Sequence, residues 1–243
     1  MNPRVSLLAL ITTLFISCNT ETKEAPVAVV SEPKTLISET DTFYGGDNLL
    51  LVNDTTETVF KALYKSDRDT SERNNLFRDA KFAYRTNDTL FLKLDNGHFK
   101  TLVSNRNTEG DDFKAYDYIC KIHDINYYLV FVSYYEAFEY LMINAKTGKE
   151  TFMCGAPALS PNKKYLASTC CDLQAGFVFN GIQMYDVGND SLIPNWKREL
   201  TKWGADEAVW MNDHTLIFKK QTVDSSQQNL VSSYIKLSCA AKQ

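Results

Sequence analysis

Cysteines are the residues with the most reactive side chains in this chain of 243 residues. Cys154 and Cys170 lie eight residues on either side of Asn162, where the sequence predicts the turn of a hairpin. Opposed cysteines in a hairpin can form a bridge, and closing a loop of about 15 residues stabilises a fold by roughly 3 kcal/mol in an oxidising compartment. We therefore predict a disulfide between Cys154 and Cys170. The alternative is that these two and the other cysteines of the domain are reduced, buried side chains; the others are Cys120, Cys171 and Cys239.

Residues for metal binding or acid–base catalysis do not form a recognisable set. No CxxC or HxxxH spacing is present, so the sequence predicts neither a metal nor a cofactor. The three histidines, His98, His123 and His214, all lie near predicted turns. A general base needs partners in its site, and no nucleophile motif accompanies these histidines. The acidic residues 109–112 lack the ligand order of a calcium-binding loop. The sequence therefore predicts no catalytic residue.

Aromatic residues are concentrated in one segment. Seven of them lie between positions 127 and 140, namely Tyr127, Tyr128, Phe131, Tyr134, Tyr135, Phe138 and Tyr140. An aromatic surface that binds carbohydrate or peptide is one interpretation. Packing in the core and across strands is the other, and we favour it because aromatic side chains dominate such contacts.

The three tryptophans, Trp196, Trp203 and Trp210, recur every seven residues. A helical stripe is excluded because Pro194 and Gly204 interrupt any helix there. The segment around Trp203 is typical of a loop, and exposed tryptophans are frequent anchors of binding interfaces. We therefore predict that Trp203 is exposed and binds a partner together with Asp206 and Glu207, the alternative being that its ring caps the core.

The elements that position these residues are predicted to be mostly β-strands. Apolar runs alternate with turn residues, as in the hairpin around Asn87 and the meander over residues 127–154, which turns at Gly148. Residues 56–64 have the apolar spacing of a short helix with a threonine N-cap. Residues 66–75 are charged and polar, and we expect a loop there.

One internal segment resembles a known repeat. Residues 158–168 read ALSPNKKYLAS and residues 181–188 read GIQMYDVG. This segment resembles the WD40-like repeat of β-propeller proteins, with Lys163 where that family usually has glycine. Weaker versions, including residues 208–218, recur at intervals of roughly 40 to 50 residues. The resemblance implies an all-β fold, a small propeller-like array of four or five four-stranded antiparallel units. An irregular β-sandwich is the alternative.

The N-terminus reads as an export signal. Arg4 precedes a mostly apolar stretch of 12 residues, Val5–Ile16, which is too short to span a bilayer. The sequence LFISC, ending at Cys18, resembles the lipobox of bacterial lipoproteins. The resemblance implies a signal peptide over residues 1–17, a lipidated Cys18 that anchors the chain to a membrane, and a location in the cell envelope, periplasmic or surface-exposed. Cleavage of an ordinary secretory signal at another bond is the alternative. Residues 18–40 are then a tether and residues 41–243 a β domain.

Composition limits the classes of function. Hydrophobic residues make up 44% of the chain and the net charge is -4, without a block of basic residues, which disfavours nucleic acid as a partner. We favour a non-enzymatic, envelope-anchored β protein that binds a protein or a glycan. The alternatives are a carbohydrate-active or other hydrolase on a propeller-like scaffold and an accessory subunit of an envelope assembly.

Overall fold

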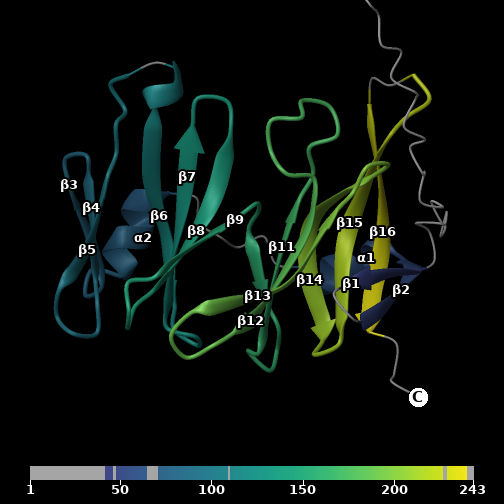
Figure 1. Ribbon diagram of the computed structural model, residues 1–243, viewed down its shortest axis with the longest axis horizontal. Coiled ribbons are helices and arrows are strands. Elements are labelled where there is room, and N and C mark those ends of the chain that lie inside the picture. The colour runs from purple at the N-terminus through teal and green to yellow at the C-terminus, as the bar shows by residue number, and fades with distance from the viewer. Residues whose placement is uncertain (1–41, 46–47, 65–70, 109, 227–228, 240–243) are drawn as a thin grey trace, which may run out of the picture. The chain divides into compact units, whose positions relative to one another are not determined.

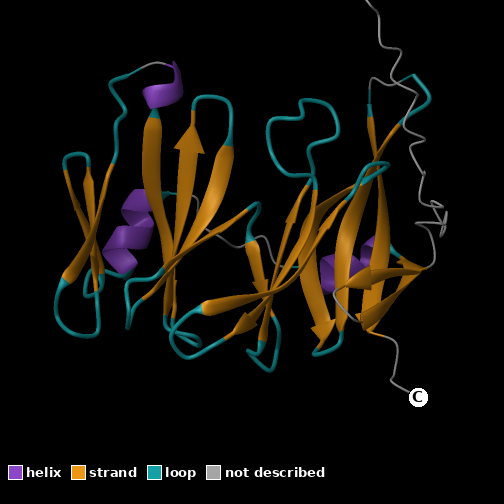
Figure 2. Cartoon of the chain, in the orientation of Figure 1, coloured by secondary structure: helices purple, strands orange, loops and turns teal. Residues whose placement is uncertain are grey.

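A computed structural model describes residues 42–45, 48–64, 71–108, 110–226 and 229–239 (Figure 1). The predicted signal peptide, the tether and Cys18 lie outside the described residues. All described residues belong to the compact unit of residues 37–243. Most of them are in strands, with short helices between some strands (Figure 2).

The strands form four antiparallel sheets, which we number in chain order. The first sheet contains β3 (Ala83–Thr86), β4 (Thr89–Lys93) and β5 (Phe99–Val103). The second contains β6 (Lys114–Ile122), β7 (Tyr127–Tyr134), β8 (Phe138–Asn144) and β9 (Glu150–Met153). The third contains β10 (Pro157–Leu159), β11 (Tyr165–Cys170), β12 (Gly181–Val187) and β13 (Leu192–Glu199). The fourth contains β14 (Gly204–Asn212), β15 (Thr215–Val223), β16 (Leu230–Cys239), β2 (Asn48–Thr55) and β1 (Thr42–Gly45).

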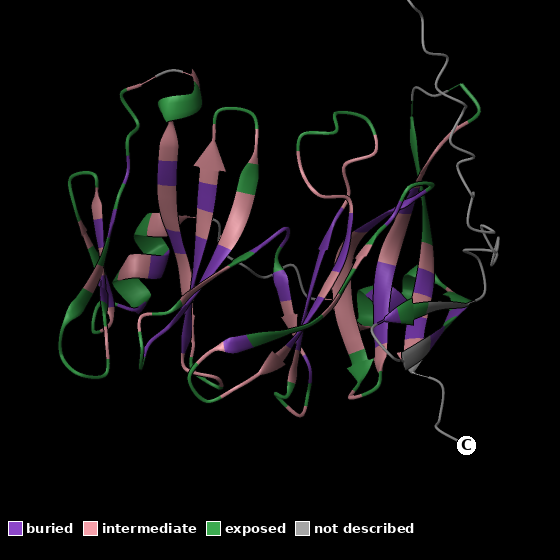
Figure 3. Ribbon diagram, in the orientation of Figure 1, coloured by how far each residue is buried: buried purple, intermediate pink, exposed green. Residues whose placement is uncertain are grey.

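Successive sheets pack against one another through their apolar faces. One core cluster joins the first and second sheets, another the second and third, and a third cluster the third and fourth. The buried segments lie along the strands, and the connecting loops are mostly exposed (Figure 3). Among the described residues, no core cluster joins the first sheet to the fourth. The fold is thus an all-β, propeller-like array of antiparallel sheets, as predicted, and the four sheets of the described residues exclude the two sheets of a β-sandwich. The predicted four strands per unit hold for the second and third sheets, whereas the first has three strands and the fourth has five.

The fourth sheet contains strands from both the beginning and the end of the domain's sequence. β2 pairs with β16 over six residue pairs, so Val52 lies opposite Leu237. The hairpin of β1 and β2 therefore completes a sheet that β14, β15 and β16 begin.

Two α-helices in the described part of the chain connect or cover the sheets. Helix α1 (Glu57–Leu63) begins at Thr56, whose side chain accepts a hydrogen bond from the Val59 N–H at 3.3 Å, as the predicted N-cap requires. Helix α2 (Glu72–Arg78) begins within the segment predicted to be a loop, and that prediction is wrong for residues 72–75. Tertiary contacts hold α2: Glu72 accepts two hydrogen bonds from Arg85, at 2.9 and 2.6 Å.

The turn of the WD40-like segment has a left-handed backbone at Lys163. The backbone of Lys163 has φ of 62°, in the left-handed region where the family has glycine. The Lys163 N–H donates to the Ser160 carbonyl at 2.9 Å, and the Tyr165 N–H donates to the Ser160 hydroxyl at 2.9 Å. The turn therefore keeps a glycine-like conformation although a lysine occupies the position.

Candidate functional site

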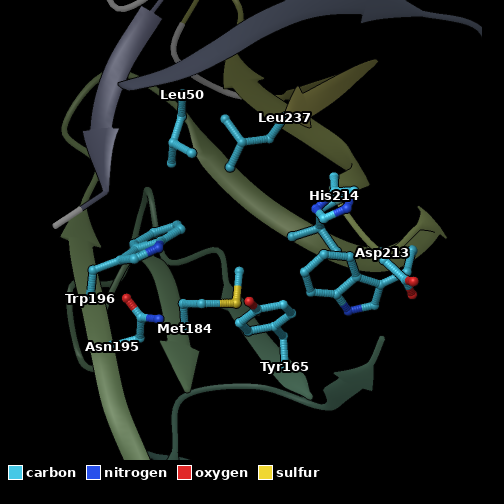
Figure 4. Close-up of a pocket in the computed structure, with 10 residues that line it drawn as sticks. Leu50, Tyr165, Met184, Asn195, Trp196, Asp213, His214 and Leu237 are labelled. Atoms are coloured by element: carbon cyan, nitrogen blue, oxygen red, sulfur yellow. The ribbon is translucent and has the colours of Figure 1, made fainter. Parts of the chain in front are cut away.

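The candidate site is a cavity of about 170 Å³ between the third and fourth sheets. Figure 4 shows Trp196 and Asp213 on opposite sides of this space, with Leu50 and Leu237 at one end and Met184 and Tyr165 at the other. Asn195, Trp210, His214 and Leu216 complete the lining. The leucines come from the buried face of the fourth sheet, whereas Asn195 and His214 are exposed. The cavity therefore has an apolar inner wall and polar groups near solvent.

A β-bulge in β13 turns Trp196 into the cavity. Leu192 belongs to the core shared with the second sheet, whereas Trp196, four residues later, packs on the core shared with the fourth. Residues an even number apart on a regular strand share one face, so the face must change between them. The register shifts there: Tyr185 pairs with Pro194 and Met184 with Trp196, which leaves Asn195 as the extra residue. Bulges commonly redirect side chains next to functional sites.

A second bulge, in β14, places Trp210 on the opposite wall. Ala205 pairs with Lys220 and Ala208 with Phe218, so β14 has one residue more than β15 over this stretch. The extra residue brings Ala208 and Trp210 onto the face that packs against the third sheet. The Trp210 indole N–H donates to the Ala158 carbonyl at 2.9 Å, and its ring stacks on Tyr165 with centroids 6.3 Å apart. These contacts fix the ring as a rigid wall of the cavity.

Two turns from the repeat-like segments meet beside the cavity. The Asn162 N–H, in the turn of the WD40-like segment, donates to the Asp213 carboxylate at 2.8 Å. Asp213 and His214 lie in the turn between β14 and β15, which has the weaker version of the same pattern. The His214 N–H donates to the Asn212 side chain at 2.9 Å, which fixes that turn. The similarity between the two segments therefore has a structural consequence, because each supplies a turn at the polar side of the cavity.

The size of the cavity indicates what it can hold. An apolar cavity of about 150 Å³ in another protein binds benzene. The present cavity is of similar volume and is lined by indole, phenol, thioether and aliphatic groups. It therefore fits one aromatic ring or one branched aliphatic group, with hydrogen-bonding atoms of the ligand near Asn195, Asp213 and His214.

The prediction that Trp203 is exposed is wrong. Its side chain is 2% exposed and belongs to the core between the third and fourth sheets. The ring stacks on Phe218, with centroids 5.7 Å apart and planes 9° apart, and the Lys220 ammonium lies 5.3 Å from its centroid. Gly204 is part of β14 and not of a loop, and a Cβ there would lie 2.3 Å from the Cys171 sulfur. Close packing of this segment against the third sheet therefore buries the ring.

The other two residues of the predicted binding site do not form one site with Trp203. The Asp206 carboxylate accepts a hydrogen bond from Gln221 and pairs with Lys219, each at 3.3 Å. The Glu207 carboxylate accepts from the Tyr64 hydroxyl at 3.2 Å and lines a polar depression of about 540 Å³ beside α1. Each acid thus has its own partner within the fourth sheet and helix α1.

Cys154 and Cys170 are close together, but they are free thiols in the structure. The Cys170 thiol is near enough to lower the pKa of Cys154, and the Cys154 sulfur lies 3.5 Å from the Ser168 hydroxyl. The register of the hairpin differs by one from the predicted one, since Pro157 pairs with Ser168. The predicted neighbourhood of the two cysteines is therefore correct, and the predicted disulfide is not formed here.

The aromatic segment divides between core and surface. Tyr127 and Tyr128 are fully buried, as expected for core packing. Phe131, Phe138 and Tyr140 pack against one another, and Phe138 is 38% exposed. Phe138 also lines a groove of about 230 Å³ between the second and third sheets, which we call the aromatic groove. Its other lining residues are Tyr134, Ala137, Glu139, Phe152, Cys154, Phe177, Val178, Phe179, Gln183 and Lys197.

The remaining features give no alternative site. His98, His123 and His214 are exposed. Within the described ranges, no three residues of the His, Cys, Asp or Glu type are grouped to hold a metal ion. None of the described helices is long and apolar enough to cross a membrane. No protein-family model and no curated protein matches the chain.

Proposed function

We propose that this chain is an envelope-anchored lipoprotein whose β domain is a binding module with its ligand in the cavity between the third and fourth sheets. The observation that carries this proposal is the pair of bulges that turn Trp196 and Trp210 toward one space. Bulges interrupt the hydrogen bonding of a sheet, so two of them around one cavity favour a site that the sequence maintains for a ligand. The signal-like N-terminus and Cys18 supply the proposed anchor.

The proposed ligand is a peptide segment of another envelope protein that inserts one aromatic or branched aliphatic side chain. Two indoles, a phenol and a thioether offer apolar contact to such a group. The inner wall of Leu50, Leu216 and Leu237 has no hydrogen-bonding side chain for the hydroxyls of a sugar ring, whose burial would then carry a penalty. Asn195, Asp213 and His214 can bind the polar backbone of a peptide near solvent. A peptide therefore fits better than a glycan.

The cavity is tested with a small analogue of an inserted side chain. Burying one ring removes about 150 Å² of surface from water, which corresponds to roughly 4 kcal/mol and a Kd of about 1 mM. We expect p-cresol to bind the purified full chain in this range by calorimetry. Met184→Phe, which fills the cavity, should weaken binding at least tenfold, and Met211→Phe, at an exposed position, should not. Equal binding to a folded Met184→Phe variant would contradict the proposal.

The anchor has a separate test. Cys18→Ala should release the protein from membranes or block its processing, because the acyl chains would provide the attachment. Metabolic labelling with a fatty-acid analogue measures this directly. Labelling of the Ala variant to the level of the unchanged chain would show that the anchor is elsewhere.

A further inference from the structure

The backbone holds the segments of Cys154 and Cys170 close together. Cys154 directly follows β9, and Cys170 ends β11. The next residue after Cys154 is Gly155, where a Cβ would lie 1.8 Å from the Thr169 carbonyl oxygen. The Gly155 N–H also donates to the Ser168 hydroxyl at 2.9 Å. Because only glycine allows this approach, Gly155 lets the segment that follows β9 lie directly against the end of β11, which brings Cys154 and Cys170 close together.

One of the two cysteines lines the aromatic groove, although both side chains are buried, with Cys154 6% and Cys170 5% exposed. Cys154 is part of the groove wall, together with exposed rings such as Phe152 and Phe177. Cys170, at the end of β11, is not part of that wall. A molecule in the groove would therefore meet Cys154 first.

The surroundings make the two thiols chemically different. The neighbouring Cys170 thiol, with smaller contributions from the Ser168 hydroxyl and the Lys197 ammonium, outweighs burial and lowers the pKa of Cys154. The same contact and burial raise the pKa of Cys170. Lys197 lies at the groove, with its ammonium 4.0 Å from the centroid of the Phe179 ring. The cysteine that lines the groove is thus the one with the lowered pKa, and it is the thiolate form that reacts with disulfides.

We propose that Cys154 and Cys170 are a reversible dithiol–disulfide couple that exchanges with small disulfides entering the aromatic groove. The Cys154 thiolate attacks one sulfur of the substrate disulfide, which forms a mixed disulfide and releases the first substrate thiolate. Cys170 then loses its proton and attacks the Cys154 sulfur, which forms the Cys154–Cys170 bond and releases the second substrate thiolate. Both released thiolates take up protons. The protein loses two electrons, and the substrate disulfide becomes two thiols.

This couple is distinct from a structural disulfide, which would resist reduction by glutathione. It is also independent of the cavity between the third and fourth sheets. The Cys120 and Cys171 thiols belong to neither the groove wall nor the proposed exchange, and they serve as internal controls.

The test equilibrates the native full chain in buffers of graded reduced and oxidised glutathione, followed by acid quenching and mass-spectrometric mapping of thiols. We expect Cys154 and Cys170 to lose their thiols together in one reversible transition, also in the Cys120→Ser and Cys171→Ser variants. Cys170→Ser should accumulate glutathione on Cys154. Cys154→Ser should leave Cys170 reduced. Lys197→Gln should slow the exchange about threefold through loss of the nearby charge, whereas Lys202→Gln should not.

Three results would overturn the couple. The first is a Cys154–Cys170 bridge that persists in excess reduced glutathione, which is the behaviour of a structural disulfide. The second is bridging that requires denaturant, which would show that the groove gives no access. The third is more glutathione bound to Cys170 in the Cys154→Ser variant than to Cys154 in the Cys170→Ser variant.

Discussion

The Trp203 ring stabilises the packing between the third and fourth sheets. It stacks on Phe218 in the core between the third and fourth sheets, and its indole N–H has no acceptor among the described residues. The ring therefore contributes through apolar burial and dispersion and not through a hydrogen bond.

We expect Trp203→Ala to lower the free energy of unfolding by about 3–5 kcal/mol, as large-to-small substitutions in cores do. Trp203→Phe should cost much less, because the indole N–H has no partner to lose. Urea unfolding followed by circular dichroism measures both. Phe177→Ala, at a ring that is 61% exposed, is the control and should change the stability by less than about 0.5 kcal/mol. A similarly small effect of Trp203→Ala would contradict the assignment to the core.

Asp172 organises the loop that forms one wall of the aromatic groove. Its carboxylate accepts hydrogen bonds from four backbone N–H groups, those of Ala175, Gly176, Phe177 and Val178, at 2.7 to 3.0 Å. Burial by itself would raise the pKa of Asp172, but the four donors outweigh it and lower the pKa. A carboxyl with a lowered pKa stabilises the fold above its unfolded pKa of about 3.9, and this contribution is lost as the pH falls through the folded value.

Asp172→Asn should therefore destabilise the protein at pH 7, and the difference from the unchanged chain should shrink as the pH falls below about 4. Unfolding free energies of the two proteins at a series of pH values measure this. Asp190→Asn removes only a surface ion pair with Lys146 and should have a small effect throughout. A difference for Asp172→Asn that grows with acidity would refute the role assigned to the carboxylate.

At the scale of elements, the turn between β10 and β11 maintains a left-handed backbone with a lysine. A non-glycine residue in that conformation carries a cost of roughly 1–2 kcal/mol. The Lys163 ammonium pairs with Asp124 at 3.0 Å, but both side chains are about half exposed, so the pair offsets little of this cost.

We expect Lys163→Gly to raise the free energy of unfolding by up to about 1 kcal/mol. Relief of the left-handed strain stabilises the fold, and the greater entropy of glycine in the unfolded chain offsets part of that gain. Lys164→Gly, one residue later, should lower it, because no positive φ occurs there. Thermal unfolding of the two variants side by side makes the comparison. If both glycines destabilise equally, the left-handed turn is not a source of strain.

Local patterns in the sequence were sufficient to predict the hairpins and α1. Asn87 and Gly148 have positive φ at the predicted turns, and Thr56 caps α1 as expected. Helix α2 was missed because its stability comes from distant partners: Arg85 binds Glu72, and the Tyr118 hydroxyl donates to Asp79 at 2.8 Å. No pattern within residues 66–78 encodes such contacts.

The bulges that form the cavity were also not predicted from the sequence, although the sequence contains one signal for them. Pro194 is exposed on β13, the edge strand of the third sheet, and proline within a sheet is confined to edges and bulges. That signal places an irregularity near Asn195. It does not reveal that Trp196 then faces the fourth sheet, because a one-residue shift in register reverses the face of every following side chain.

At the scale of the molecule, the repeated hairpins predicted the array of sheets, but the site depends on which sheets face each other. Leu50 and Leu237 line the same cavity although they are far apart in the chain, because β2 pairs with β16. The loop-like sequence around Trp203 predicted an exposed ring at a binding site. The packing of the third sheet on the fourth buries it and leaves Trp196 and Trp210 at the cavity.

The central claim is that this cavity binds an apolar side chain, and the methionine methyl groups report on it directly. Met184 lines the cavity, Met142 and Met153 are buried in the core between the second and third sheets, and Met211 is exposed. In a chain labelled with ¹³C-methyl methionine, titration with p-cresol should shift the Met184 resonance saturably, because a ring bound beside it changes its magnetic environment. The Met142 and Met153 resonances should stay in place. A Met184 resonance that does not move, or equal shifts of all four, would contradict the account.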